Sequence, residues 1–324
     1  MAPQLSKDTN GSDLVTAYAD HIKGKTILVT GVSPGGLGAT FAETVVAASL
    51  ATLILAGRNT TKVQQTADAI TAANPSVRIK TLELDLGSFK NVRKAAETVN
   101  GWEDVPHIDV LVNNAGIMAV PFSSTEDGFE SQFGTNHLGP FLFTNLIMGK
   151  VLAAAEPRVV TVSSDGHRLG HIRWSDYNFN NGKHYNQWHA YGQSKTANCL
   201  MAISLAEKLG SKGLLSFSLH PGVIFTNLGT HLENFDSLRE QDINVGSKLM
   251  WAEFNPKTPD QGVATHIYTA FSPDLKGLNG KYFNDCRLAD QYNEEVHSWA
   301  TDKIDADRLW KLSEKLVGEE FAYE

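Results

Sequence analysis

The sequence of 324 residues is 42% hydrophobic and 20% charged and contains no repeat or low-complexity tract, which suits one large domain with a buried core. Its formal net charge of −8 argues against a broad basic surface for nucleic acid or for an anionic membrane. Its two cysteines, Cys199 and Cys286, provide neither a disulfide framework nor the spacing of a zinc site. We therefore expect no bound metal and a reducing, cytoplasmic location.

The N-terminal residues 1–23 are mostly polar and predict a leader that feeds a short helix. They lack an apolar core of the length that a secretory signal or a membrane span requires, so no membrane anchor is expected. The remainder, residues 24–324, is predicted to be a single domain.

Apolar, β-branched strands alternate with helices along most of the chain. The predicted strands are 25–30, 51–57, 77–84, 108–114, 158–164 and 214–220, and the predicted helices are 36–48, 60–73, 88–100, 126–153 and 189–209. This alternation predicts an α/β fold with a doubly wound parallel sheet that helices cover on both faces. Ligands of such sheets bind at the carboxyl ends of the strands, so the chemistry is expected there.

The last part of the chain predicts three shorter elements. Residues 258–271 indicate a helix with Thr258 or Asp260 near its cap, 280–285 an edge strand, and 289–316 a polar, amphipathic helix. That final helix could cover the pocket, pair with a second subunit in a homo-oligomer, or merely finish the domain, and the sequence does not choose among these roles.

The stretch VTGVSPGGLG, residues 29–38, ends the first predicted strand and begins the first predicted helix. Gly31 permits a sharp exit from the strand, while Gly36 and Gly38 let the helix start close to both the sheet and a pyrophosphate. An ordinary strand-to-helix turn would also explain the glycines alone. The surrounding alternation of strands and helices favours nucleotide binding.

The ends of the second and third strands indicate which nucleotide binds. A free ribose 2′-hydroxyl usually meets a carboxylate after the second strand, whereas a 2′-phosphate needs a cation. Because LAGRN offers Arg58 and no carboxylate, NADP is favoured over NAD, although an arginine at a strand end is often simply solvated. Asp85, after the third strand, is placed to accept a hydrogen bond from an adenine amino group or to cap the helix that begins near Ser88.

The arrangement YGQSK predicts the class of reaction. Tyr191 and Lys195 are one helical turn apart, so their polar ends can converge. An ammonium about 4 Å from a phenolate stabilises it by roughly 4 kcal/mol at an effective dielectric near 20, or about three pKa units before desolvation is deducted. That shift would bring the pKa of Tyr191 near 7, within the range of an acid/base catalyst.

Two further residues complete the candidate catalytic set. Ser164 ends the fifth strand, where its hydroxyl can bond a carbonyl or alcohol oxygen, while Ser163 faces the other side of the strand. Asn136 can kink its helix through side-chain bonding to the backbone and hold a water that connects Lys195 to solvent. Any one of these residues alone would usually be structural.

Together these pieces resemble the short-chain dehydrogenase/reductase family. The matching motifs are TGVSPGGLG, LDL with Asp85, NNAG at 113–116, Asn136, Ser164, YGQSK and HPGVIFTNL at 220–228, in family order across roughly residues 24–230. The segments NHLGPFLF, VSSDGH and SLHPG are most similar to the branch of the retinol dehydrogenases and the WW-domain oxidoreductase.

The resemblance implies a Rossmann fold, a tyrosine acid/base, a lysine that binds the nicotinamide ribose and lowers the tyrosine pKa, an orienting serine and an asparagine in a proton relay. The catalytic residues are then expected to be Asn136, Ser164, Tyr191 and Lys195. The expected cofactor contacts are Gly31, Ser33, Gly36, Leu37, Gly38, Arg58, Asn59, Asp85, Leu86, Asn113, Ala115, Gly116, Tyr191, Lys195, Pro221, Gly222, Val223 and Thr226.

The glycine loop departs from the family pattern. Gly36 and Gly38 each lie one residue farther from Gly31 than in the usual motif. Pro34 and Gly35 favour a turn that holds the extra residue without disturbing the helix start. In the family, the middle of this loop contacts the adenosine phosphate. The longer loop puts that contact in question for Ser33 and Pro34.

Two segments, about 165–190 and 226–256, flank the predicted active face and are expected to bind an apolar or aromatic substrate, with about half of their large side chains in the core. These side chains are Trp174, Tyr177, Phe179, Tyr185, Trp188, Leu228, Leu232, Phe235, Leu249, Met250, Trp251 and Phe254. His167 and His171 have no third ligand at a convincing spacing, so they are expected at the pocket rim or in solvent.

The sequence therefore predicts an NADP(H)-dependent oxidoreductase that transfers a hydride between the nicotinamide and a hydrophobic ketone, aldehyde or secondary alcohol. One alternative is a regulatory protein that senses NADPH without chemistry, but the chain keeps both Tyr191 and Lys195. A nucleotide-sugar epimerase or dehydratase is a third reading, against which the short C-terminal part argues.

Overall fold

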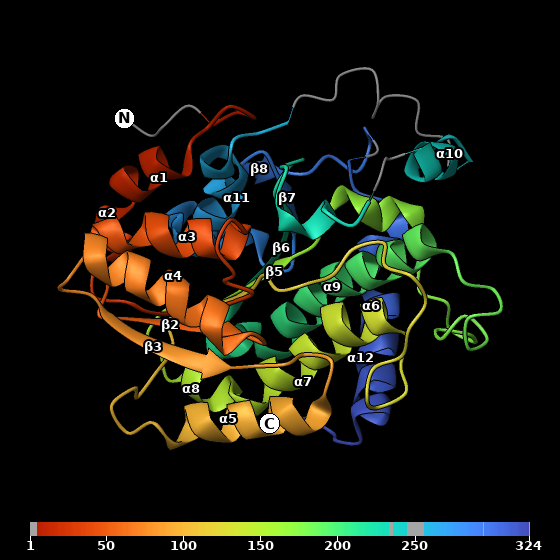
Figure 1. Cartoon of the computed structure of the whole chain (residues 1–324), viewed down its shortest axis with the longest axis horizontal. Coiled ribbons are helices and arrows are strands. Elements are labelled where there is room, and N and C mark those ends of the chain that lie inside the picture. The colour runs from red at the N-terminus through yellow and green to blue at the C-terminus, as the bar shows by residue number, and fades with distance from the viewer. Residues whose placement is uncertain (1–4, 233–235, 245–255, 294, 324) are drawn as a thin grey trace.

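The computed structural model describes residues 5–232, 236–244, 256–293 and 295–323. Its centre is one sheet of eight strands in the order β3-β2-β1-β4-β5-β6-β7-β8 (Figure 1). The strands are β1 Thr26–Thr30, β2 Thr52–Gly57, β3 Arg78–Glu83, β4 Val110–Asn113, β5 Arg158–Val162, β6 Leu215–His220, β7 Tyr282–Asn284 and β8 Arg287–Leu288. The neighbouring strands from β3 to β7 pair in parallel, and only the β7–β8 pair is antiparallel.

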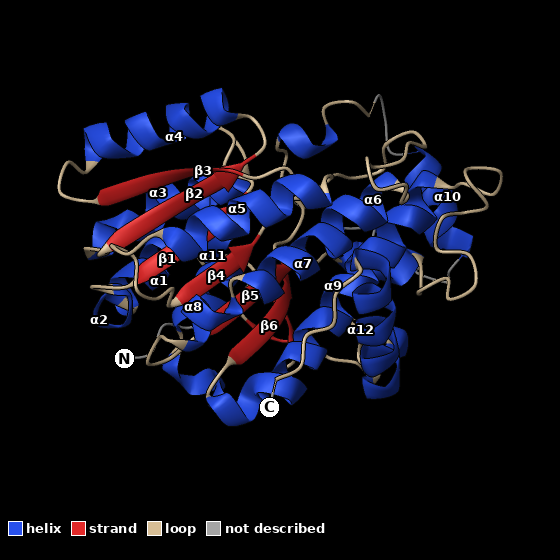
Figure 2. Cartoon of the chain, turned by 90° about the horizontal axis from the view of Figure 1, so that it is seen from below, coloured by secondary structure: helices blue, strands red, loops and turns tan. Residues whose placement is uncertain are grey.

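The strands at the middle of the sheet are apolar throughout because helices cover both faces. Every residue of β1, β4 and β5 is buried, which is the pattern of a parallel sheet rather than of a half-exposed one. Strand order reverses between β1 and β4, which are neighbours with Leu28 opposite Leu111 (Figure 2). Connections leave this pair in opposite directions, so a crevice opens at their carboxyl ends. The predicted doubly wound Rossmann fold is confirmed.

The helices form a layer on each face of the sheet. One apolar cluster joins the sheet to α1 Gly11–Ala17, α2 Ala19–Ile22, α3 Leu37–Val45, α4 Thr60–Ala73 and α11 Pro259–Phe271. A second cluster joins the other face to α5 Phe89–Gly101, α7 Gly139–Leu146, α8 Met148–Leu152, α9 Gln187–Leu209 and α12 Lys303–Val317. A short helix, α10 Asp236–Asn244, lies between segments that are not described.

The predicted N-terminal leader includes a helix that packs on the domain. In α1, Leu14 is fully buried, and the Ser12 hydroxyl donates to the Asp260 carboxylate of α11 at 2.7 Å. Asp260 is thereby occupied, and the cap of α11 is Thr258, which forms a capping box with Gln261. Within the described residues, no helix is long and apolar enough to cross a membrane.

The predicted continuous helix over 126–153 is wrong, because the chain there forms several pieces. It runs through α6 Ser131–Phe133, a π turn at Gly134–Leu138, then α7 and α8. Close packing sets the path: a Cβ on Gly139 would lie 2.2 Å from the carbonyl oxygen of Leu86. The kink expected at Asn136 is therefore present as the π turn, a feature often found at functional sites.

The C-terminal elements also differ from the prediction. Helix α12 begins at Lys303, capped by Asp302, and not at residue 289, since β8 at Arg287–Leu288 and a turn at Ser298–Ala300 precede it. Strand β7 is consequently not the edge of the sheet. In Figure 1, α12 lies beside α9 at the lower right. Its Trp310 ring meets the Phe141 ring of α7 at 4.9 Å between centroids, so α12 closes this layer.

Removing the Trp310 side chain should therefore destabilise the fold. The indole is 3% exposed, so Trp310→Ala is expected to lower the free energy of unfolding by about 3–5 kcal/mol through lost burial and a cavity. Lys311→Ala, on the exposed side of the same helix, should change it by less than about 1 kcal/mol. Urea unfolding followed by circular dichroism compares the two, and equal losses would contradict this account of α12.

Candidate active site

A cleft of about 950 Å³ runs along the carboxyl ends of the parallel strands. It is bounded by the segments that follow β1, β2, β3, β4, β5 and β6 and by one side of α9. This is the place where a doubly wound sheet binds its ligand, and its size suits a dinucleotide and a small substrate together.

The glycine-rich turn forms the floor of the cleft next to β1. Gly31 has φ +76°, and a Cβ there would lie 2.6 Å from the Cα of Ala115, so only glycine fits between β1 and β4. The extra residue of the loop is absorbed at Pro34 and Gly35, where Gly35 has φ +76° and Gly36 N–H donates to the Ser33 carbonyl. The predicted position of the turn agrees with this geometry.

The start of α3 is open toward this turn. Its N-cap Gly36 has no side chain that could bond the first amides, so these N–H groups remain available to an anion. Across the cleft, the Asn227 amide donates to the Pro34 carbonyl at 2.8 Å, which joins the glycine loop to the segment after β6. The cradle fits a pyrophosphate, which needs close backbone approach and free donors.

Two cations lie at the end of β2. Arg58 and Lys62 are both exposed and both line the cleft. Neither side chain forms an ion pair within the described residues, although Asn59 between them caps α4 by accepting from the Lys62 amide. Uncompensated positive charge at this position suits a phosphate on the ribose.

The ends of β3 and β4 contribute polar groups of two kinds. Asp85 accepts from the Gly87 amide at 3.0 Å and lines the cleft, while the cap of α5 is Ser88, so the alternative that Asp85 caps this helix is wrong. Asn113 turns away from the cleft and donates to the Thr144 hydroxyl at 2.9 Å. The next residue, Asn114, faces the cleft and donates to the carbonyls of Thr30 and Gly31.

Ser164, Tyr191 and Lys195 meet at one end of the cleft. Ser164 follows β5, and its oxygen accepts from the Gly166 amide at 3.0 Å, which leaves its own O–H to donate elsewhere. Tyr191 and Lys195 lie on α9, whose start is capped by Asn186. The Lys195 ammonium donates to the Val162 carbonyl at 3.1 Å and lies 5.6 Å from the centroid of the Tyr191 ring.

The electrostatics of this group correct the sequence-based expectation. Burial raises the pKa of Tyr191 to about 12, the Ser164 hydroxyl opposes this rise, and the Asp165 carboxylate adds to it. Desolvation of the phenolate is the largest influence on this pKa, so the value near 7 that was expected before desolvation is not reached in the protein alone. Burial also lowers the pKa of Lys195 to about 8. Within the protein alone, the tyrosine is thus a protonated acid.

Asn136 acts as a clamp behind these residues and does not line the cleft. Its amide donates to the Ile117 carbonyl at 2.8 Å and to the Ser194 hydroxyl at 2.9 Å, and its oxygen accepts from the Ile117 amide at 2.8 Å. Both amide donors are used, so the side chain cannot hold a water by donation. The Asn136 side chain thus connects three segments: the π turn that contains it, the segment after β4 at Ile117, and α9 at Ser194, next to Lys195.

Most predicted cofactor and catalytic residues line the cleft. Those that do are Gly31, Ser33, Gly36, Leu37, Arg58, Asn59, Asp85, Leu86, Ala115, Gly116, Ser164, Tyr191, Lys195, Pro221, Gly222, Val223 and Thr226. Asn113, Asn136 and Gly38 do not; a Cβ on Gly38 would lie 2.6 Å from the Gly31 carbonyl, so this glycine serves the contact between α3 and β1.

Sequence reasoning missed several cleft residues. They are Lys62, Asn114, Asp165, His220 and His231. Lys62 carries a signal, since it lies in the first turn of α4, four residues after Arg58, and shares its charge. Asp165 directly follows Ser164, but nothing in the pattern shows that both side chains reach the cleft.

The substrate end of the cleft has an apolar wall. Trp188, Leu232 and Leu238 line it and pack in one cluster with Leu169 and Met118. Of the other predicted side chains, Leu228 lines the cleft, whereas Trp174, Tyr177, Phe179 and Tyr185 pack elsewhere. Phe235, Leu249, Met250, Trp251 and Phe254 lie outside the described residues.

His167 is neither at the rim nor in solvent, so this part of the prediction is wrong. It is 1% exposed, its Nδ1 meets the Ser164 carbonyl at 2.7 Å, and its Nε2 accepts from the His297 amide. Burial lowers its pKa to about 4, so the ring is neutral and supports the strand end that bears Ser164. His171 is exposed, as expected.

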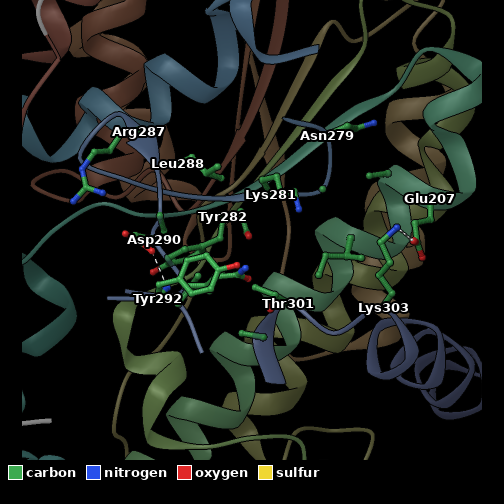
Figure 3. Close-up of a pocket in the computed structure, with 18 residues that line it drawn as sticks. Glu207, Asn279, Lys281, Tyr282, Arg287, Leu288, Asp290, Tyr292, Thr301 and Lys303 are labelled. Carbon is green, nitrogen blue, oxygen red and sulfur yellow. Dashed lines mark hydrogen bonds and ion pairs between the residues drawn. The ribbon is translucent and has the colours of Figure 1, made fainter. Parts of the chain in front are cut away.

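A second cavity of about 540 Å³ lies apart from this cleft, between the C-terminal half of α9, the β7–β8 hairpin and the start of α12 (Figure 3). Two ion pairs involve its lining residues: Lys303 with Glu207 at 2.7 Å and Arg287 with Glu295 at 2.5 Å. None of the predicted catalytic or cofactor residues lines it. The dinucleotide-type site is therefore the cleft at the strand ends.

A doubly wound sheet with a glycine turn at one end of a cleft and Ser164, Tyr191 and Lys195 at the other defines a nicotinamide-dependent oxidoreductase. Comparison with known proteins gives the family: a family model described as short chain dehydrogenase matches residues 25–236. The chain belongs to the short-chain dehydrogenase/reductase family, in its retinol dehydrogenase branch, as the sequence motifs predicted.

Named relatives are similar over nearly the whole chain. Retinol dehydrogenase 14 of Mus musculus is 38% identical over 305 residues, covering 91% of this chain and 86% of that protein. Short-chain dehydrogenase TIC 32 B, chloroplastic, of Brassica napus is 38% identical over 300 residues, covering 90% and 88%. The crystal structure of an uncharacterized protein from Mycobacterium Paratuberculosis, at 32% identity, has a TM-score of 0.70 and covers 94% of this chain and 98% of that one.

Burial of the Lys195 ammonium should cost stability in the cofactor-free protein. Its pKa falls from 10.5 to about 8, so the folded state binds this proton less tightly than the unfolded chain and stability rises with pH between those values. Lys195→Met is expected to raise the free energy of unfolding at pH 7 by roughly 2–3 kcal/mol.

That gain should shrink as the pH rises from 8 to 10.5. Urea unfolding at pH 7 and at pH 10 measures it, with Lys94→Met on the exposed side of α5 as the control, for which no such gain is expected. A gain that does not depend on pH would mean that packing and not charge explains it.

Proposed function

We propose that this chain is an NADP(H)-dependent carbonyl reductase or alcohol dehydrogenase that transfers a hydride between the nicotinamide and a hydrophobic ketone, aldehyde or secondary alcohol. The observation that carries the proposal is the single cleft that holds the glycine turn and two free cations at one end and Ser164, Tyr191 and Lys195 beside an apolar wall at the other. Membership in the short-chain dehydrogenase/reductase family supports it.

The cofactor supplies or accepts the hydride when bound, and the remaining steps belong to the chain's own residues. The Ser164 O–H, freed for donation by the Gly166 amide, orients the substrate oxygen. Tyr191 gives its proton to that oxygen in the reducing direction and takes it back in the oxidising direction. Because burial keeps the tyrosine protonated in the protein alone, the resting state is prepared for carbonyl reduction.

Lys195 and Asn136 support the proton transfer by fixing the segments around Tyr191. The Lys195 ammonium is fixed by the Val162 carbonyl, on the side of α9 that bears Tyr191 one turn earlier. Asn136 fixes the neighbouring backbone at Ile117 and the helix at Ser194. Its role in this proposal is therefore to hold the relay geometry, with the side chain itself fully bonded.

The choice of NADP rests on Arg58 and Lys62, the two unpaired cations at the end of β2. Asp85 remains available for the adenine amino group, at the end of β3. The substrate class rests on the wall formed by Trp188, Leu232 and Leu238, and a relative named retinol dehydrogenase is consistent with an apolar alcohol.

Replacing Tyr191 by Phe removes the acid/base without removing the ring. Turnover of apolar ketones with NADPH should fall by about 10²–10⁴-fold, while the Kd of NADPH stays within about three-fold. Single-turnover oxidation of NADPH measures the first quantity and fluorescence titration the second. Tyr292→Phe, at an exposed tyrosine on the rim of the second cavity, is the control. A fully active Tyr191→Phe protein would refute the assignment, and NADPH binding without turnover in the native protein would favour the sensor instead.

Replacing Arg58 by Ala tests the cofactor. A lost hydrogen bond to a charged group costs about 1.5–3 kcal/mol, so the Kd of NADPH should rise roughly ten- to a hundred-fold. Lys62→Ala should have a smaller effect, and the Kd of NADH should stay nearly constant in both variants. If NADPH and NADH weaken equally, Arg58 does not read the 2′-phosphate and the preference for NADP is wrong.

A further inference from the structure

The catalytic end of the cleft contains a carboxylate that the reaction does not use. Asp165 directly follows Ser164, lines the cleft, and its side chain is 27% exposed. Of the described acidic residues that line the cleft, Asp85 lies at the end of β3, so Asp165 provides the negative charge beside Tyr191.

One cation, Arg168, and the buried His220 ring, whose pKa burial lowers, lie near this carboxylate. Arg168 Nη1 lies 3.6 Å and His220 Nε2 lies 3.8 Å from a carboxylate oxygen. Both distances exceed those of ordinary hydrogen bonds, so these contacts are mainly electrostatic. Burial opposes ionisation of Asp165, but the surroundings of His220, Arg168 and the Ser164 hydroxyl hold its pKa below its usual range. The group is therefore ionised at neutral pH.

An ionised carboxylate offers about four acceptor positions. In the protein alone the Ser164 O–H occupies one of these positions, and it leaves that position when it turns to a substrate oxygen, so acceptor capacity remains on the exposed side of Asp165. The apolar wall with Trp188 and Leu238 lines the same cleft and packs against Tyr191. A substrate that fills this end thus meets one strong acceptor next to the residues that bind its reacting oxygen.

We propose that Asp165 determines specificity by accepting a hydrogen bond from a hydroxyl group that the substrate carries next to its reacting carbon, and by rejecting substrates with a carboxylate at that position. The proposal rests on the proposed function for the identity of the reacting carbon. The preferred substrate is then an apolar molecule with a hydroxyl adjacent to the carbonyl or alcohol that reacts.

The selectivity follows from what each ligand leaves unpaired. A ligand with a hydroxyl group donates a hydrogen bond to the Asp165 carboxylate in place of the water that it displaces. A ligand without this group displaces the water and leaves the carboxylate unpaired, so it should bind more weakly. A second carboxylate would meet the charge of Asp165 in a cleft with little water, where like charges repel strongly.

The first test measures binding, which does not require turnover. The protein is loaded with NADP⁺ and titrated with 2-octanol, 1,2-octanediol and 2-hydroxyoctanoate, with quenching of tryptophan fluorescence as the signal because Trp188 lines the cleft. The diol should bind about ten-fold more tightly than 2-octanol, and the hydroxy acid about ten-fold more weakly. Equal affinity for the diol and 2-octanol would overturn the proposal.

Variants at Asp165 locate the effect. Asp165→Leu should abolish the preference for the diol, because 2-octanol then no longer desolvates an unpaired carboxylate and should bind up to about ten-fold more tightly. Asp165→Asn, which keeps the shape and one neutral acceptor, should retain part of that preference and lose the rejection of the hydroxy acid. Asp68→Leu, at an exposed carboxylate on α4, is the matched control and should change neither ratio. An Asp165→Asn protein that still rejects the hydroxy acid would contradict the charge argument.

Turnover separates this proposal from the proposed function. With NADPH, 1-hydroxy-2-octanone should be reduced with a kcat/KM about ten-fold above that of 2-octanone, and Asp165→Leu should equalise the two. Binding selectivity that depends on Asp165 without any turnover would support the specificity site and refute the oxidoreductase. Turnover of both ketones at equal kcat/KM in the native protein would refute the specificity site alone.

Discussion

The bond between the Lys195 ammonium and the Val162 carbonyl, at 3.1 Å, joins the two elements on which the active site depends. Val162 ends β5, so the bond fixes α9 against the strand end that carries Ser164. Tyr191, one turn before Lys195, is thereby held at the end of the cleft that lies opposite the glycine turn. A buried ammonium is costly, and its hydrogen bond to the Val162 carbonyl offsets part of that cost.

The same contact explains why a strand end and a helix can form one chemical site. The serine comes from an extended segment and the tyrosine and lysine from a helix of 23 residues that is buried over most of its length. Ser163 adds a second tie, since its hydroxyl donates to the Lys195 carbonyl at 2.7 Å, while Ser164 faces the cleft. The two serines that follow β5 therefore have different roles: Ser163 anchors α9, and Ser164 faces the cleft.

The sheet could be predicted from the sequence because a parallel strand buried on both faces reads as an unbroken apolar run, as in β1 and β5. The points at which the helices are interrupted could not be predicted in this way. The interruption at Gly134–Leu138 arises where Gly139 meets the Leu86 carbonyl, a contact between segments far apart in the chain. Hydrophobic periodicity does not record such contacts, and it also began the last helix at 289, ahead of the turn at Ser298–Ala300 that precedes α12.

At the site, the residues that turns and strand ends expose were predictable, whereas the direction of single side chains was not. Asn113 and Asn114 are neighbours of the same type, yet the first bonds Thr144 in the core and the second faces the cleft. The pKa of Tyr191 was misjudged for a related reason: spacing placed the ammonium correctly, but the cost of burying the phenolate depends on the whole surroundings.

The C-terminal helix shows how a distant segment completes the site. Its Ser313 hydroxyl meets His137 Nε2 at 2.8 Å in the core, and His137 directly follows the clamp residue Asn136 in the π turn. Burial lowers the pKa of His137 to about 3, so the ring stays neutral and the contact persists at physiological pH. Of the three roles that the sequence left open for this helix, the packing shows the one that completes the domain, because α12 joins the apolar cluster on this face of the sheet and none of its described residues lines the cleft.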